Sequence, residues 1–113
     1  SSVKAYNVTR NLLSMPEPPT AIFVTGYRMG YGVLTAIRDA GLAIGRDIAV
    51  TCFDRTEFID LFRPAITVIE QPLDQMGQAA ADLMLGRITR ERAGPPERIQ
   101  LNTRMLPADP VTR

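Results

Sequence analysis

The sequence predicts an α/β fold with a doubly wound parallel sheet. Three short apolar runs, at 21–25, 48–53 and 67–69, have the composition of buried strands, and each ends at polar residues. Amphipathic helical patterns follow the first and the third run. Because open parallel sheets bind ligands at the carboxyl ends of their strands, these three ends mark the expected site of a small molecule.

Bulk composition restricts the class of protein. The chain has 113 residues, enough for one small domain, and its net charge of +1 gives no bulk attraction to nucleic acid or to an anionic membrane. No apolar run approaches the roughly 20 residues of a membrane span, and no secretory signal opens the sequence. The single cysteine excludes an internal disulfide and suits a reducing compartment. We therefore expect a cytoplasmic protein without membrane association.

The first half of the chain contains a strand–helix–strand unit. Residues 3–14 form a weak helical pattern, and three prolines between 16 and 19 then predict an extended connector to the first strand. The helix over 29–40 is the clearest element, because its apolar residues recur at helical spacing. Gly41 stands where a left-handed C-cap belongs. The unit 21–53 is a βαβ motif with a right-handed crossover.

The segment 58–62 is too apolar for an ordinary loop and leaves two interpretations open. It contains Phe58, Ile59, Leu61 and Phe62. It is either a short helix folded over the core or a contact between subunits, since clustered surface aromatics mark interfaces.

The second half begins with the third strand, at about 66–71, and continues as a helix. Pro72 suits a first helical position, and the helical pattern extends over 73–88. Residues 89–98 form a polar linker whose arginines could contact phosphate, although the interleaved Glu91 and Glu97 favour a solvated segment. Residues 99–106 alternate like a half-buried strand.

Two groups of residues could carry chemistry. Gly26, Gly30 and Gly32 open the second helix and either hold a phosphate or permit a tight turn and close packing; they match no nucleotide fingerprint. Asp54 follows a buried strand, and its carboxylate either accepts hydrogen bonds from ligand hydroxyls or pairs with Arg55, Thr56 or a backbone N–H. Both interpretations of Asp54 remain equally open.

Catalysis and metal binding are not expected. The acidic residues Asp54, Glu57, Asp60 and Glu70 match no cation-binding loop, and the chain has no histidine to complete a mixed site. Cys52 lies within an apolar strand, as a structural thiol does, and no nucleophile-elbow sequence is present. We predict no catalytic residue, no metal ligand, no cofactor and no enzymatic activity.

Four segments resemble the lactose/galactose repressor (LacI/GalR) family of transcription regulators. They are 19–42, which reads PTAIFVTGYRMGYGVLTAIRDAGL; 45–54, GRDIAVTCFD; 64–72, PAITVIEQP; and the helix around 76–84. The resemblance is collinear over about 18–106. It implies a periplasmic-binding-protein-like sensor in which two α/β lobes clasp a sugar or another metabolite and thereby alter DNA affinity.

The resemblance also implies which residues bind the effector. The motif-matched positions are Gly26, Tyr27, Asp54, Arg55, Gln71 and Leu73. Asp54 keeps the family residue, whereas Gly26 and Tyr27 replace the usual Asn-Asp pair and Arg55 replaces a frequent second acid. A more apolar, aromatic or anionic effector therefore fits Tyr27, Arg28 and Arg55 better than a simple sugar does.

In this family the chain would be the C-terminal part of the effector domain. We expect 20–71 to form the core of one lobe, 72–88 to be a helix that would pack on a lobe outside this sequence, and 89–98 to link to the strand 99–106. Without that lobe, we expect Met76, Ala80, Leu83 and Met84 to expose an apolar surface that a second copy of the chain or repacking covers. Operator DNA would be bound only by a separate helix-turn-helix domain. The homodimer contacts implied are Met29, Val33, Phe58, Ile59, Leu61 and Phe62. The alternatives are a sugar-type periplasmic binding protein and a Rossmann-type enzyme, which would need a nucleotide fingerprint that this sequence lacks.

Overall fold

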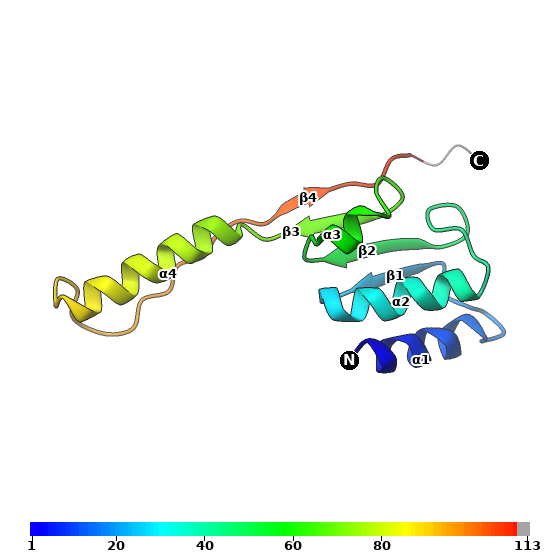
Figure 1. The fold of residues 1–113 in the computed structure, drawn as a ribbon, viewed down its shortest axis with the longest axis horizontal. Helices are drawn as coiled ribbons and strands as arrows, with labels where there is room; N and C mark the ends of the chain where they lie inside the picture. The colour runs from blue at the N-terminus through cyan, green and yellow to red at the C-terminus, as the bar shows by residue number, and fades with distance from the viewer. Residues whose placement is uncertain (111–113) are drawn as a thin grey trace. The chain divides into compact units, whose positions relative to one another are not determined.

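The computed structural model describes residues 1–110, which form two compact units. The first unit contains 1–70 and 105–110, and the second contains 71–104. The elements in chain order are α1 (Ser2–Leu13), β1 (Ala21–Val24), α2 (Tyr27–Asp39), β2 (Ala49–Phe53), α3 (Glu57–Asp60), β3 (Thr67–Glu70), α4 (Leu73–Ile88) and β4 (Arg104–Leu106) (Figure 1). Within the described residues, no helix has the length and apolarity needed to cross a membrane.

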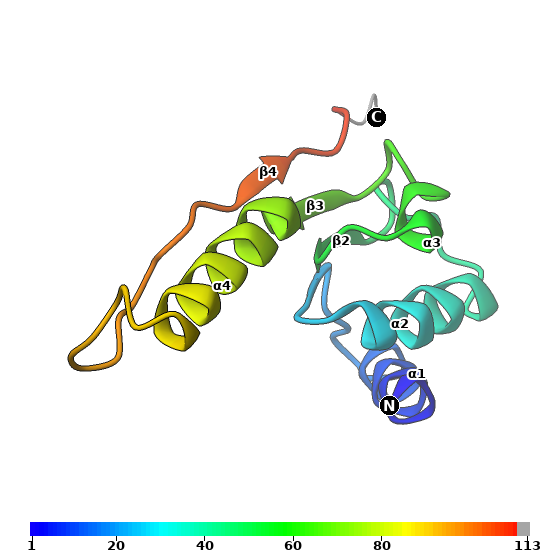
Figure 2. The ribbon, with the colours of Figure 1, turned by 60° about the vertical axis from the view of Figure 1, so that its left-hand side comes forward.

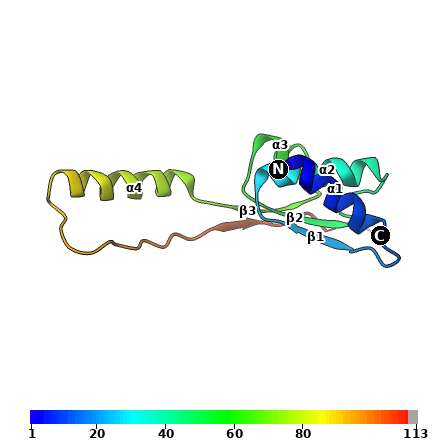
Figure 3. The ribbon, with the colours of Figure 1, turned by 90° about the horizontal axis from the view of Figure 1, so that it is seen from below.

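The strands form one sheet in the order β1-β2-β3-β4, and the first three are parallel. Val24, Cys52 and Val68 are opposite one another in register and are almost fully buried. Helices α1, α2 and α3 all lie over this face of the sheet (Figure 3). The predicted α/β class with a parallel sheet is confirmed.

Helix α2 supplies the largest part of the core. Its Leu34 and Ile37 side chains are fully buried beneath the helix, against the sheet. Gly41 follows with a left-handed φ of 71°, and its N–H donates to the Arg38 carbonyl at 2.9 Å. The N–H of Leu42 donates to the Ile37 carbonyl at 3.2 Å, which completes the expected C-cap.

Close packing accounts for two of the glycines in α2. Helix α1 lies side by side with α2 in both views (Figures 1 and 2). A Cβ atom at Gly32 would overlap the Ser2 carbonyl oxygen of α1, and one at Gly30 would come within 3.2 Å of Ile59 Cδ1. This arrangement supports the packing interpretation of Gly30 and Gly32.

The apolar segment after β2 is a short helix over the core. In α3, Thr56 Oγ1 accepts a hydrogen bond from the Ile59 N–H at 3.2 Å, and the Ile59 side chain is fully buried. Leu61, which follows the last residue of α3, is 78% exposed. The core interpretation therefore holds for Ile59, while Leu61 leaves an apolar surface beside it.

The second unit consists of α4 and an ordered polar linker. Helix α4 begins and ends where its pattern predicted, and the Met76, Ala80 and Met84 side chains are exposed whereas Leu83 is half-buried. In the linker, Arg87 donates to the Gly94 and Pro95 carbonyls at 2.6 Å each, and Arg92 pairs with Glu97 at 3.1 Å. Arg87 and Arg92 thus have contacts within the linker itself.

The last predicted strand was too long. The alternation over 99–106 predicted eight strand residues, but only Arg104–Leu106 are in a strand, and 99–103 have no regular structure. Ile99, the first apolar residue of the pattern, is exposed instead of half-buried. Alternation of apolar and polar residues predicts a strand only where a neighbouring strand can pair with the segment and a core can bury its apolar side chains.

Candidate functional site

Asp54 occupies the turn that ends β2. Its backbone has a φ of 76°, a left-handed conformation that few residue types adopt without strain. Its N–H donates to the Ile69 carbonyl of β3 at 2.9 Å, which ties the turn to the neighbouring strand. The side chain is half-buried. A carboxylate therefore stands at the carboxyl ends of β2 and β3, as the sequence predicted.

Gly26 and Tyr27 lie at the equivalent end of β1, where α2 begins. Gly26 is the N-cap in extended conformation, and no side chain caps the first turn of α2. Tyr27 and Arg28 are exposed, and neither side chain has a hydrogen bond or ion pair within residues 1–110. This end of α2 presents unpaired N–H groups, a phenol and a guanidinium together.

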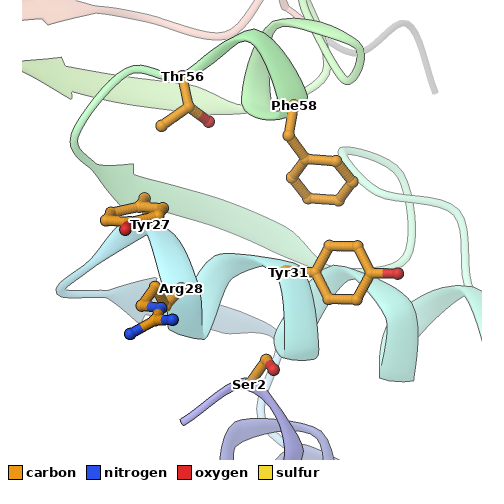
Figure 4. A pocket seen from close by; sticks show the side chains of 6 residues that line it. All are labelled: Ser2, Tyr27, Arg28, Tyr31, Thr56 and Phe58. Atoms are coloured by element: carbon orange, nitrogen blue, oxygen red, sulfur yellow. The ribbon is translucent and has the colours of Figure 1, made fainter.

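A shallow pocket of about 260 Å³ lies between this end of α2 and α3. Tyr27, Arg28 and Tyr31 line it from α2, Thr56 and Phe58 from the α3 side, and Ser2 from α1 (Figure 4). The Tyr31 and Phe58 rings are in contact, with centroids 4.9 Å apart. Sequence reasoning did not single out Tyr31, although its position four residues after Tyr27 puts both on one face of α2.

Arg55 is held by two carboxylates. Its Nε donates to both Asp60 carboxylate oxygens at 3.0 and 3.1 Å, and its Nη1 donates to Glu70 Oε1 at 3.3 Å. These hydrogen bonds, the stronger to Asp60, raise the pKa of the Arg55 guanidinium above its usual value. Arg55 is thus adjacent to Asp54 in the chain but has its charge neutralised within the protein.

The two remaining effector candidates belong to the second unit. Gln71 precedes α4, and its carbonyl accepts a hydrogen bond from the Leu73 N–H at 2.9 Å. Leu73 begins α4 and is exposed. Both residues therefore lie at the amino end of α4.

The residues predicted at the dimer contact divide into two groups. Val33 and Ile59 are buried in the core. Met29 and Leu61 are exposed, and Phe58 and Phe62 are half-buried with ring centroids 5.3 Å apart. The candidate surface is therefore presented by Met29, Tyr31, Leu61 and the edges of the two phenylalanines, and Val33 and Ile59 support it from beneath.

Other reactive groups are few in the described part of the chain. Burial raises the pKa of the Cys52 thiol to about 11, so the thiolate is scarce at neutral pH. Among residues 1–110, no group of three or more histidine, cysteine, aspartate or glutamate side chains could hold a metal ion.

The comparisons with known proteins identify the family. Residues 2–107 match the family model of the periplasmic binding protein-like domain. The chain belongs to this family. The chain is 39% identical over 87 residues to the HTH-type transcriptional repressor PurR of Edwardsiella ictaluri (strain 93-146), an alignment that covers 77% of this chain and 26% of the repressor.

Solved structures agree with this assignment. The transcriptional regulator CelR in complex with cellobiose has a TM-score of 0.81 and 29% identity, over 94% of this chain and 32% of CelR. The Lac repressor bound to ONPG in the repressed state has a TM-score of 0.76 and 27% identity, again over 94% of this chain and 32% of the repressor. The resemblance to the effector domain of LacI/GalR regulators is confirmed, and these relatives are transcription regulators. The chain spans only about a quarter to a third of the length of these relatives.

Proposed function

We propose that this chain is the effector-sensing and dimerising part of a cytoplasmic LacI/GalR-type transcription regulator. Effector binding would modulate operator binding by a helix-turn-helix domain of the whole protein, and no enzymatic activity is involved. The observation that carries the proposal is the Asp54 carboxylate at the carboxyl ends of adjacent parallel strands, in a chain whose relatives are repressors. The structure of CelR with cellobiose supports a small-molecule effector for a domain of this fold.

The groups near Asp54 favour an effector with an aromatic or anionic part. Tyr27 and Arg28 stand at the uncapped start of α2, where backbone N–H groups and the helix dipole favour negative charge. A hydroxyl of the same effector would donate to Asp54. Arg55 is a weaker candidate for direct contact, because Asp60 and Glu70 already neutralise it.

A thermal-shift screen of the intact regulator against sugars, nucleobases and aromatic carboxylates tests this function. We expect an aromatic or anionic compound to give the largest stabilisation. For that compound, Asp54→Asn should weaken binding roughly 10- to 100-fold, the size of one lost hydrogen bond to a charged group. Asp109→Asn is the matched control, because Asp109 is exposed near the amino end of β3, where its N–H bonds the Pro64 carbonyl. A simple hexose as the best stabiliser, or equal binding by Asp54→Asn, would refute the effector assignment.

The apolar surface of α2 and α3 supports dimerisation. Met29, Tyr31 and Leu61 expose apolar atoms around the Phe58 and Phe62 rings. Arg28 and Glu57 are exposed beside this surface and form no ion pair within residues 1–110. A two-fold axis pairs such a surface with itself, so that opposite charges at its border can meet.

Analytical ultracentrifugation of matched variants tests the dimer surface. Leu61→Asp should weaken dimerisation at least tenfold, since it places a charge at the centre of an apolar contact. Val8→Asp makes the same chemical change at an exposed apolar position of α1 and should leave the dimer constant unchanged. Circular dichroism establishes that both variants fold. Unchanged dimerisation of Leu61→Asp would exclude this surface.

A further inference from the structure

Arg55 joins three elements through one guanidinium. It lies two residues after the end of β2, while its partners are Asp60, the last residue of α3, and Glu70, the last residue of β3. The distances from its nitrogens to the carboxylate oxygens are 3.0 to 3.3 Å. The side chain is 42% exposed, so the pairs are partly solvated.

These contacts hold the turn in which Asp54 lies. The Asp54 N–H bonds the Ile69 carbonyl of β3, and one residue later Arg55 bonds Glu70 of the same strand. The other side of the turn is fixed to α3 by two hydrogen bonds. Arg55 donates to Asp60, and Thr56 Oγ1 accepts from the Ile59 N–H. The left-handed backbone of Asp54 is therefore held from β3 and from α3 at once.

A role in overall stability does not account for this arrangement. Exposed ion pairs contribute little to folding stability, because solvent screens them and because two side chains must be ordered. A planar guanidinium shared by two carboxylates instead fixes geometry, since its donors have set directions. Removing Arg55 would remove the guanidinium that contacts both Asp60 of α3 and Glu70 of β3.

We infer that Arg55 is a positioning residue for Asp54, one that orients the effector-binding carboxylate and couples it to the helix of the dimer surface, and that it does not contact the effector itself. The inference rests on the proposed function for the role of Asp54. The structural part of the inference, the clamp on the turn, stands on the contacts of Arg55 alone.

Amide hydrogen exchange measured by NMR on the chain without effector tests the clamp. Arg55→Gln should reduce the protection of the Asp54 amide by about fivefold, the upper size of a single exposed ion-pair contribution. The double variant Asp60→Asn/Glu70→Gln should have the same effect, although it keeps the arginine. In both, the Leu34 amide in the core of α2 should keep its protection, which shows that the change is local. The residue-54 backbone coupling constant should move away from its left-handed value in the same variants.

Arg46→Gln is the matched control. Arg46 is also an exposed arginine paired with a carboxylate, Asp47, at 3.0 Å, but it lies before β2, at the opposite end of that strand from Asp54. Arg46→Gln should leave the hydrogen-exchange protection of the Asp54 amide unchanged. Unchanged protection at Asp54 in Arg55→Gln would overturn the inference, and so would protection that falls in Arg55→Gln but not in the double variant.

Effector binding separates the positioning role from direct contact. The double variant and Arg55→Gln should both bind the compound found in the thermal-shift screen more weakly than the unsubstituted protein does. If Arg55 contacted an anionic effector directly, removing its two competing carboxylates would strengthen binding, and that result would also overturn the inference. Failure of Asp54→Asn to affect binding would refute the proposed role of Asp54, while leaving the exchange result on the clamp valid.

Discussion

At the scale of single residues, the site depends on backbone conformation as much as on charge. Asp54 adopts a φ of 76°, in a region where asparagine, aspartate and glycine are tolerated and most other residues are strained. The residue at position 54 therefore meets two requirements: the turn needs a residue that tolerates a left-handed φ, and the proposed effector contact needs a carboxylate. Substitutions that separate the two requirements distinguish them.

A series at position 54 makes the backbone requirement measurable. Asp54→Ala should destabilise the fold by about 1 kcal/mol relative to Asp54→Gly, because alanine pays the steric cost of the left-handed region. Asp54→Asn should stay close to the unsubstituted chain, since asparagine tolerates that region and has nearly the same shape. Urea denaturation gives the differences. Equal stability of the alanine and glycine variants would show that the turn changes its backbone conformation freely.

Cys52 illustrates the opposite case, a reactive group made inert by its position. Burial between Val24 and Val68 on the sheet raises its pKa to about 11, so the thiolate population at pH 8 is below one per cent. We expect a disulfide reagent such as DTNB to modify the native chain only on the timescale of unfolding and to react at once in urea. The rate should stay low as pH rises from 7 to 9. A fast reaction of the native chain would contradict this burial.

Sequence could predict that Asp54 follows the end of β2 but not the contacts that shape its turn. Asp54 was found because it follows an apolar run, a signal that is local in the chain. The partners of Arg55 lie 5 and 15 residues away, on a helix end and on another strand. Sequence periodicity does not indicate contacts between side chains on different elements. Arg55 was therefore predicted to be a ligand of the effector.

At the scale of elements, the helices are determined locally and the last strand is not. Helices α2 and α4 fall within two residues of their predicted limits, because Gly41 and Pro72 mark a helix end and a helix start in the sequence itself. β4 covers only the end of its predicted range, since strand length depends on a neighbour. Close packing was one of two interpretations of Gly32 in the sequence, but only the fold identifies α1 as the helix that packs there.

Gly32 tests that packing. Gly32→Ala would add a Cβ where the Ser2 carbonyl and the Tyr6 backbone nitrogen of α1 lie, so α1 must shift. Overpacking of this kind costs about 1–3 kcal/mol, against a gain of about 1 kcal/mol from helix propensity. We expect net destabilisation in thermal denaturation followed by circular dichroism.

Gly77→Ala provides the comparison, because no atom lies within 4 Å of the Cβ it would add in α4. This variant should gain helix propensity without a clash and should not lower the helical signal. A Gly32→Ala variant as stable as the unsubstituted chain would mean that α1 does not pack closely on α2.

At the scale of the whole chain, the two units differ in how they are stabilised. The first contains every buried apolar residue of the core, among them Leu34, Ile37 and Val68. In the second, Gly86 is the one buried residue of α4, and the apolar side chains Leu73, Met84 and Ile88 are exposed. An isolated helix of this length is marginal in water, so α4 has little of its own to keep it folded.

Hydrogen exchange of the 113-residue chain should therefore show two stability classes. The α2 amides around Leu34 and Ile37 are expected to exchange only through global unfolding, because their helix is buried against the sheet. The α4 amides from Met76 to Leu85 should exchange by local opening, at least a hundredfold faster, because opening that helix exposes little new apolar surface. A partner that covers the apolar side of α4 would remove the difference, whether it is the remainder of the regulator or a second copy of the chain. Equal protection of α2 and α4 at high dilution, where sedimentation finds a monomer, would show that α4 is stabilised within this chain and needs no partner.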